Sequence, residues 1–322
     1  MRHIEGKFRV GAVAILAFAL TVSRAHAQPA QRAILSAKFQ RDLERIASDA
    51  PGVVGFAIVD LVSGERFGVN DTLTFPQASA IKVPILLTLH QQVERGRVKM
   101  DDRIALRASD QAAGSGVLQT FGDGTSQLSL GDYAALMIVL SDNTATNVLI
   151  DRIGMDTVNA FIRSLGLDKT RLRRKMTRPA DMARGDENTS SPREASQLLM
   201  RLAKCDLPMQ RARCDASRKL MEIEHPVSED RMPGVPDDLV VAWKAGDLTG
   251  VRTGWGIASL PGRPYVFVSM TNYNGNDSTA RAPMRKAATA AYEYFSRLAG
   301  ATPYGARIDL KYFPSDTVPK RP

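Results

Sequence analysis

Strand-like segments lie near both ends of the chain, and a long helical stretch separates them. The segments "VVGFAIVDL" (53–61) and "RFGVN" (66–70) are rich in β-branched and aromatic residues and flank "VSGE", which is typical of a hairpin. Between about 79 and 220 the apolar residues recur at helical spacing. Three more strand-like segments then follow, at 238–246, 250–260 and 265–272. Strands from both ends of the chain must therefore meet in one sheet, which severely limits the possible folds.

Runs of strand and helix, rather than strict alternation, predict an α+β fold. We expect a sheet of about five antiparallel strands, with terminal helices over 30–49 and 278–298 on one face. The predicted parts are an α/β part over about 30–75 and 225–298, an all-α part over about 79–222 with loops at 107–128 and 170–192, and a C-terminal tail over 301–322.

The N-terminus has the three parts of a secretory signal. A basic segment comes first, the apolar run "VGAVAILAFALTV" follows, and "AHA" at 25–27 is a small-x-small cleavage site. The apolar run is shorter than the roughly 20 residues of a membrane span. We therefore predict a signal peptide over 1–27, with an uncleaved anchor as the alternative. The domain over 28–300 should be periplasmic or secreted, without stable membrane insertion.

The charge of the chain argues against a nucleic-acid partner. Removing the signal takes away four basic residues and one acidic residue, which lowers the formal net charge from +9 to +6. Basic residues are scattered, apart from "RLRRK" at 171–175. We interpret that run as a solvated or substrate-facing turn.

The small number of histidines and the sequence around the serines disfavour two kinds of hydrolase. Only His90 and His225 remain after the signal, too few for a histidine-rich metal centre, and we interpret them as ordinary surface or boundary residues. No serine lies in a G-x-S-x-G sequence, the nucleophile signature of one large group of Ser-His-Asp hydrolases. The two cysteines, Cys205 and Cys214, could close a small loop in an oxidising compartment. We expect no metal and no organic cofactor.

The segment "FPQASAIKVPILL" (75–87) places a lysine inside an apolar run, three residues after a serine. If a helix begins at Ser79, Lys82 lies one turn further along the same face. The first turn has free N–H groups and the positive end of the dipole, which favour an oxyanion there. A lysine in an apolar pocket can lose its proton at neutral pH and serve as a base for the hydroxyl. S-x-x-K alone is common by chance, however, and also fits a helix cap with a snorkelling lysine.

Two further motifs strengthen the catalytic interpretation. Ser141-Asp142-Asn143 lies at a helix–helix junction, and Lys244-Ala245-Gly246 lies on a strand. S-x-x-K, S-D-N and K-T-G form the motif set of class A β-lactamases and penicillin-binding proteins. The chain resembles the class A β-lactamase family, and more closely its β-lactamase-related serine hydrolase branch, over roughly residues 30–298. Segments such as "GSGVLQ" and "TSSPREASQLL" have counterparts in that family.

The resemblance implies a serine β-lactamase/penicillin-binding-protein-like fold and assigns the catalytic roles. Ser79 would be the acylated nucleophile and Lys82 its proton acceptor. Ser141 would pass a proton to the leaving nitrogen. Asp142 would brace the turn.

The same resemblance assigns the substrate-binding roles. Asn143 would hold the substrate's side-chain amide, and Lys244 its carboxylate. The oxyanion hole would combine the N–H groups of Ser79 and of Asp247, the residue that follows Gly246.

The loop near residue 176 departs from the family's pattern. In the family, a loop glutamate orients the water that breaks the acyl-enzyme, and here Met176 stands at its place. Ala180 or Asp181 falls where an asparagine is expected. The nearby acids are Asp181, Asp186 and Glu187. We interpret them as loop-bracing partners of Arg173, Arg174 or Arg178.

The third motif departs as well. Lys-Thr-Gly has become Lys-Ala-Gly, so Ala245 supplies no hydroxyl for a substrate carboxylate. Arg252 could replace part of that contact, or could be an ordinary surface arginine. Trp243 could wall the pocket, or could simply pack as a half-buried tryptophan.

These features predict an exported serine hydrolase that opens β-lactams through an acyl-serine intermediate. We expect a monomer acting on a small-molecule β-lactam or a peptidoglycan-like substrate. One alternative is a slow-turnover penicillin-binding, D-Ala-D-Ala peptidase-like or esterase-like protein. Another is a non-enzymatic periplasmic relative. The absent glutamate and Ala245 favour these alternatives, whereas the intact catalytic set favours an enzyme.

Overall fold

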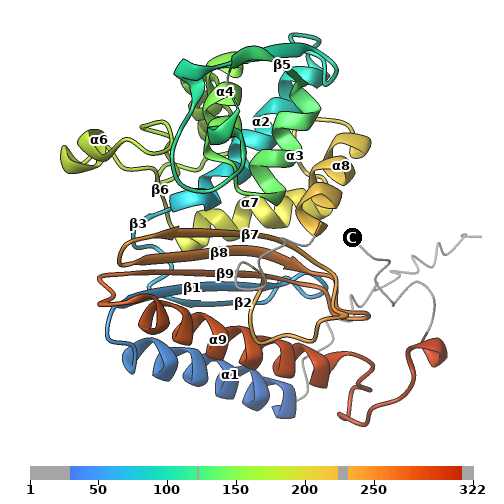
Figure 1. The fold of residues 1–322 in the computed structure, drawn as a ribbon. Coiled ribbons are helices and arrows are strands. Elements are labelled where there is room, and N and C mark those ends of the chain that lie inside the picture. Colours follow the sequence, from blue (N-terminus) through green and yellow to red (C-terminus); the bar gives the residue numbers. More distant parts are fainter. Residues whose placement is uncertain (1–29, 122, 224–230, 314–322) are drawn as a thin grey trace, which may run out of the picture.

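One antiparallel sheet organises the structure. The computed structural model describes residues 30–121, 123–223 and 231–313. Its five-stranded sheet has the order β2-β1-β9-β8-β7, and helices cover both faces (Figure 1). The α+β class and the antiparallel sheet are thus confirmed. The strands are β1 (Val53–Asp60), β2 (Arg66–Val69), β7 (Val241–Leu248), β8 (Val251–Ala258) and β9 (Tyr265–Asn272).

The terminal helices α1 (Ala30–Ser48) and α9 (Asp277–Leu298) lie together on one face of the sheet, as expected (Figure 1). Their apolar side chains form one cluster with that face, in which the rings of Phe39 and Tyr294 stack with centroids 4.5 Å apart. Because aromatic side chains bury large apolar areas, such contacts contribute much of this part's stability. The terminal helices thus cover one face of the sheet, and the helical part packs on the other face.

The opposite face carries the helical part, whose centre is α2 (Lys82–Glu94). Every residue of α2 from Lys82 to Gln92 is buried, which is expected of a helix surrounded by other elements. Helix α7 packs on β1, β8 and β9 and joins this part to the sheet. The other helices here are α3 (Leu130–Val139), α4 (Asn143–Ile153), α5 (Met155–Ser164), α6 (Pro179–Ala183), α7 (Pro192–Lys204) and α8 (Arg211–Glu222).

The histidine on α2 does not lie where the sequence suggested. His90 is 3% exposed, and burial, followed by the nearby charge of Arg213, lowers its pKa to about 4. The histidine is therefore neutral near pH 7, in the core rather than at the surface or boundary. His225 and the predicted signal peptide lie outside the described residues. Within the part of the chain that is described, no helix is long and apolar enough to cross a membrane.

Two regions predicted as loops contain short strands. Strands β4 (Arg103–Arg107) and β5 (Asp123–Ser129) pair antiparallel. The prediction of a loop over 107–128 is therefore wrong for residues 123–128, which belong to β5. The β5 segment "DGTSQLS" has little strand propensity, and its pairing with a distant segment sets its conformation instead. In the second region, β6 (Thr189–Ser190) pairs with β3 (Phe75–Pro76), which anchors this loop beside the segment that carries Ser79.

Short 3₁₀ turns complete the described elements. One of them lies in the predicted tail, where Ala301 and Arg307 also form an isolated bridge. The turns are η1 (Ala78–Ile81), η2 (Ala108–Asp110), η3 (Leu118–Thr120) and η5 (Leu310–Tyr312).

The two cysteines form a disulfide that joins the end of α7 to α8. Cys205 and Cys214 are nine residues apart, with Cα atoms 5.7 Å apart. Because such a bond restricts the unfolded chain, replacing both cysteines with alanine is expected to lower the free energy of unfolding by about 2.5 kcal/mol. Urea unfolding of the oxidised protein measures this change.

The control for the disulfide is a reductant. Reduction should lower the stability of the wild type to that of the double alanine variant and should leave the variant unchanged. Equal urea midpoints of the wild type with and without reductant would contradict the expected contribution.

Candidate active site

Ser79 lies on the 3₁₀ turn η1, immediately before α2. The sequence suggested that the helix begins at Ser79, whereas the α-helix begins three residues later, at Lys82. In a 3₁₀ turn, side chains three apart are nearly eclipsed, so Ser79 and Lys82 still share one side. The turn begins at Ala78 with a φ of 47°, a left-handed conformation that is uncommon without glycine. Backbone strain of this kind is typical of functional sites.

A buried glutamine and a glycine hold this turn against the sheet. The Gln77 side chain accepts a hydrogen bond from Trp255 Nε1 at 3.0 Å, and the Gln77 backbone carbonyl accepts one from Thr253 Oγ1 at 2.9 Å. A Cβ on Gly246 of β7 would lie 2.8 Å from the Ala80 amide nitrogen, so only glycine allows strand and turn to approach so closely. Strand β7 therefore passes directly beside the serine turn.

Lys82 is the centre of a hydrogen-bond cluster. Its Nζ lies 3.1 Å from Ser79 Oγ, 3.1 Å from Ser141 Oγ and 2.9 Å from Asn143 Oδ1. It also donates to the Ser141 carbonyl at 2.5 Å. The side chain is fully buried. Burial lowers the pKa of Lys82 well below its ordinary value, the charge of Lys244 lowers it further, and Asp142 opposes both.

The Ser141-Asp142-Asn143 segment joins α3 to α4. Ser141 has a φ of 53°, and Asp142 is the N-cap of α4, accepting from the Ala145 N–H at 2.9 Å. The second carboxylate oxygen of Asp142 accepts from the amides of Val117 and Leu118. Asp142 thus braces two backbone segments, which agrees with the structural role inferred for it, and leaves Ser141 and Asn143 to face Lys82.

Lys244 reaches the same cluster from the sheet. Its Nζ lies 3.0 Å from Ser141 Oγ and donates to the Ala245 carbonyl at 3.0 Å. Ser141 is therefore placed between two lysine side chains, one from α2 and one from β7. The structure thus brings together Ser79, Lys82, Ser141, Asn143 and Lys244, although they lie far apart in the sequence.

Asp247 and Arg252 lie opposite each other on β7 and β8. They are partners in the sheet register, and an ion pair of 3.2 Å joins their side chains. Arg252 is 2% exposed, so it is not the surface arginine of the alternative interpretation. The guanidinium therefore has a carboxylate beside it within the protein and lies on β8, next to the edge strand β7 that carries Lys244.

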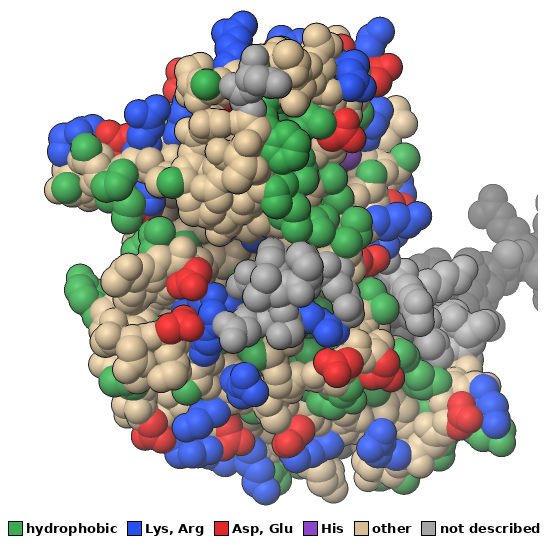
Figure 2. Space-filling model, viewed as in Figure 1, with side chains coloured by type: hydrophobic (Ala, Val, Ile, Leu, Met, Phe, Trp, Pro, Cys, Tyr) green, Lys and Arg blue, Asp and Glu red, His purple; other side chains and the backbone are tan. Residues whose placement is uncertain are grey.

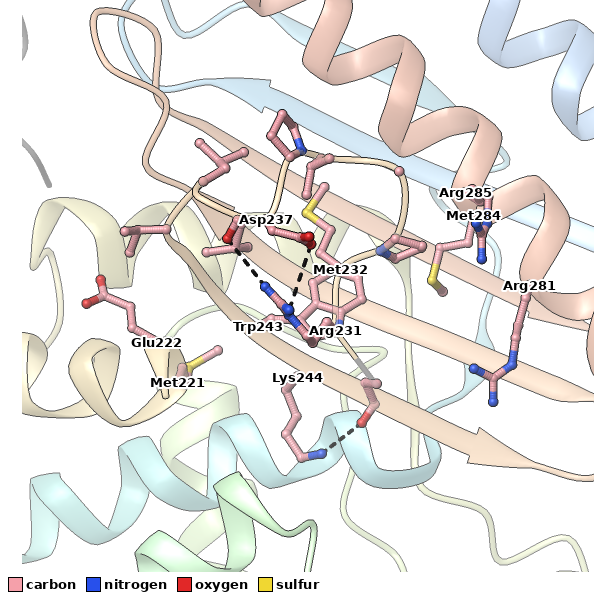
Figure 3. Close-up of a pocket in the computed structure, with 18 of the residues that line it drawn as sticks. Met221, Glu222, Arg231, Met232, Asp237, Trp243, Lys244, Arg281, Met284 and Arg285 are labelled. Atoms are coloured by element: carbon pink, nitrogen blue, oxygen red, sulfur yellow. Dashed lines mark hydrogen bonds and ion pairs between the residues drawn. The ribbon is translucent and has the colours of Figure 1, made fainter. Parts of the chain in front are cut away.

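A cavity of about 720 Å³ extends from Lys244 and Arg252 along β7 toward α9. Figure 3 shows Trp243 and Met232 beside Arg231, and Arg281, Met284 and Arg285 on α9. Arg231 is paired with Asp237 at 3.8 Å. Ser79 does not line this cavity, which therefore adjoins the hydrogen-bond cluster around Lys82 rather than containing it.

Trp243 does not wall the serine cluster. Neighbouring residues on a strand point to opposite faces, so Trp243 faces the terminal helices while Lys244 faces Ser141. The indole lies over Gly254 and Gly256 of β8, where a Cβ on Gly254 would come within 2.1 Å of it. Trp243 thus packs as a half-buried tryptophan and lines the neighbouring cavity, not the serine cluster.

In the described loop that follows α5, Met176 supplies no carboxylate, and the nearby acids are paired with arginines. Met176 is 5% exposed, and its backbone is held by Asn147, which accepts from the Met176 amide at 2.8 Å. Glu187 pairs with Arg174 at 2.6 Å, one of the partners that we inferred. Asp181 and Asp186 instead pair with Arg184, a residue outside the set that we named.

Side chains of the "RLRRK" run brace this loop. Arg173 donates to the Glu187 carbonyl and to Thr189 Oγ1, and Lys175 pairs with Asp151 at 2.5 Å. On the face in Figure 2, basic and acidic side chains are interspersed over the sheet-bearing part, without one large basic area. Among the described residues, no three His, Cys, Asp or Glu side chains gather to hold a metal ion.

Gln77 and Thr177 are parts of this site that the sequence motifs do not predict. Gln77 anchors the serine turn, and Thr177 Oγ1 lies 3.2 Å from Asn143 Nδ2. Neither residue belongs to the three motifs. Their positions depend on tertiary contacts between distant segments, for which the sequence carries no local signal.

The fold and the placement of two lysines around Ser141 define a serine β-lactamase/penicillin-binding-protein-like architecture. A solved β-lactamase from Sphaerobacter thermophilus is 31% identical, with a TM-score of 0.72, covering 80% of this chain and 97% of that one. A variant of PBP-A, solved as an acyl-enzyme complex with penicillin G, is 29% identical with a TM-score of 0.74. That match covers 81% of this chain and 97% of PBP-A.

The family model described as "Beta-lactamase enzyme family" matches residues 38–295, and the chain belongs to that family. Beta-lactamase SME-1 of Serratia marcescens is 26% identical over 189 residues. This match covers 58% of the present chain and 61% of SME-1, so the chain spans about three fifths of that curated relative.

Proposed function

We propose that this chain is an exported serine hydrolase of class A β-lactamase type, acylated by β-lactams at Ser79. The observation that carries the proposal is the position of Lys82 Nζ, 3.1 Å from both Ser79 Oγ and Ser141 Oγ. Family membership and the penicillin G acyl-enzyme of the PBP-A variant support the same chemistry. Ser79 is half-buried, so its hydroxyl remains accessible to a small ligand.

Acylation begins with proton transfer from Ser79 Oγ to the neutral Lys82 amine. The oxygen then attacks the lactam carbonyl carbon, and the N–H groups of Ser79 and Asp247 stabilise the developing oxyanion. The close approach of Gly246 to the serine turn supports this placement of the second donor. Collapse of the tetrahedral intermediate breaks the C–N bond and leaves an ester on Ser79.

The leaving nitrogen receives its proton through Ser141. Ser141 Oγ lies within hydrogen-bond distance of Lys82 and Lys244, so it can give its proton to the nitrogen and recover one from Lys82. The Lys244 ammonium and Arg252 attract the substrate carboxylate. Asn143 binds the side-chain amide of the substrate.

A slow-turnover, penicillin-binding type of activity is the second candidate. Met176 supplies no carboxylate to activate water, and Glu187, Asp181 and Asp186 are all ion-paired with arginines. Without a general base, hydrolysis of the acyl-enzyme loses a contribution of about 10²- to 10⁴-fold. The adduct would then accumulate.

Mixing the protein with a chromogenic cephalosporin tests both candidates. Steady product release supports a β-lactamase, whereas a burst of one equivalent with a stable mass adduct supports the slow-turnover protein. Ser79→Ala should remove both signals. If wild type forms no adduct and matches Ser79→Ala, neither candidate holds, and the non-enzymatic alternative remains.

We also propose that residues 1–27 direct export and are removed, leaving the hydrolase domain over 28–300 and the tail over 301–322. The charge and apolar pattern of the N-terminus supports this division. N-terminal sequencing of protein recovered from the periplasm or medium tests the division. An intact N-terminus on membrane-bound protein would instead support the anchor.

The pH dependence of acylation should follow the protonation of Lys82. Because only the neutral amine accepts the serine proton, the second-order acylation rate constant should rise about tenfold per pH unit and then level off. The plateau should begin well below pH 10.5, since burial and Lys244 lower the pKa of Lys82. Lys244→Met removes one lowering charge and should shift the midpoint to higher pH. An unchanged midpoint would contradict this coupling.

A further inference from the structure

The side-chain amide of Asn143 has each of its hydrogen-bonding groups engaged within the protein. Its Oδ1 accepts from Lys82 at 2.9 Å. Its Nδ2 donates to the Ala113 carbonyl at 2.9 Å and to Thr177 Oγ1 at 3.2 Å. An amide nitrogen has two protons, so these two acceptors use both. A substrate carbonyl can therefore bind Asn143 only by displacing one of them.

Of the two acceptors, Thr177 is the one that a ligand can displace. Ala113 belongs to a loop that wraps tightly around Asn143: a Cβ on the neighbouring Gly114 would lie 2.9 Å from Asn143 Nδ2, and the Ser115 carbonyl accepts from the Asn143 backbone N–H. Thr177 makes the longer contact and its side chain is exposed. Once displaced, its hydroxyl keeps its hydrogen bond to Ala113 at 2.8 Å and meets water.

The loop around Thr177 is built to hold the hydroxyl at this point. Thr177 has a φ of 55°, which a β-branched residue rarely adopts. The preceding Met176 is buried and bonded to Asn147 through its backbone, and the Arg174–Glu187 pair fixes the base of the loop. The strained backbone is thus maintained by contacts on the N-terminal side of Thr177, and its consequence is the contact with Asn143.

We propose that the Thr177 hydroxyl is an internal competitor for Asn143 and thereby determines substrate specificity. It occupies the place of the substrate's side-chain amide carbonyl, so β-lactams that carry such an amide must displace it, and those that lack one need not. This inference rests on the proposed function of the site. It makes Thr177 a positioning residue, since it acts through Asn143 and not on the reacting atoms.

Thr177→Val tests the proposal because valine keeps the β-branched shape and removes the hydroxyl. In this variant the substrate competes only with water for Asn143, so the acylation rate constant for benzylpenicillin should rise about fivefold, the value of one typical hydrogen bond. The rate constant for penicillanic acid without a side chain should not change. Thr177→Ser keeps the hydroxyl and should behave as the wild type.

Two kinetic results would overturn the proposal. Equal slowing of both compounds in Thr177→Val would mean that Thr177 only supports the fold, and unchanged rate constants for both compounds would mean that no competition exists. A second measurement does not need acylation: the Asn143 side-chain amide proton should shift upfield in the NMR spectrum of free Thr177→Val. If the wild type neither forms an adduct nor releases product, the proposed function fails, whereas absence of this shift refutes the competition itself.

Discussion

Replacing Lys82 with methionine is expected to slow acylation of Ser79 about a thousandfold. The substitution removes the only described amine within 3.1 Å of Ser79 Oγ, and a positioned general base typically contributes 10²- to 10⁴-fold. Methionine has a similar length and suits the buried position, so the fold should be retained. Mass spectrometry of the adduct formed with a penicillin over time measures the change.

Stability as a function of pH provides an independent check of the same residue. The pKa of Lys82 is lowered in the folded protein, so between that pKa and its unfolded value the unfolded chain binds the extra proton. Stability of the wild type relative to Lys82→Met should therefore increase as the pH rises through this window, and decrease as the pH falls. Urea unfolding at several pH values between 7 and 10 measures the difference.

A control for Lys82→Met is the loss of a lysine outside the site. Lys99 is exposed, and Lys99→Met should leave both acylation and the pH dependence of stability unchanged. Acylation of Lys82→Met within tenfold of the wild type would show that another group takes the serine proton.

The hydrogen-bond cluster around Lys82 could be predicted from sequence because its residues are tied to local motifs. Ser79 and Lys82 are three apart and Ser141 and Asn143 two apart, so short-range geometry places each pair together. The resemblance to a family then joined these pairs to Lys244. The exact start of α2 could not be predicted, since η1 depends on contacts of Gln77 with Thr253 and Trp255.

Other parts of the site required the fold itself. The partners of Asp181 and Asp186 depend on how the loop closes, and Thr177 meets Asn143 only through that closure. The sequence motifs leave the role of Trp243 open. Once that segment is taken as a strand, however, alternation places the side chains of Trp243 and Lys244 on opposite faces of the sheet. The pairing of β4 with β5 was missed because its strand segments have weak local patterns.

Replacing Met176 with glutamate is expected to accelerate hydrolysis of the acyl-enzyme about a hundredfold. The Met176 amide bonds to Asn147, one helical turn after Asn143, which in turn contacts Lys82. Because these contacts link position 176 to the Lys82 cluster, we expect a carboxylate introduced here to act on the ester at Ser79. Burial of this position, which is 5% exposed, should raise the pKa of the new carboxyl group toward the range of an effective base near neutral pH.

Met176→Gln separates the carboxylate from the change in shape. Glutamine has the size of glutamate but cannot accept a proton from water, so its adduct should persist as long as that of the wild type. Both variants should be less stable than the wild type, because each places a polar group among apolar side chains. Decay of the penicillin adduct, followed by mass spectrometry after removal of excess ligand, distinguishes them. Equal decay in the two variants would mean that deacylation is limited by access of water to the ester and not by the missing base. Thr177, which holds the loop beside Asn143, would then be the next residue to replace.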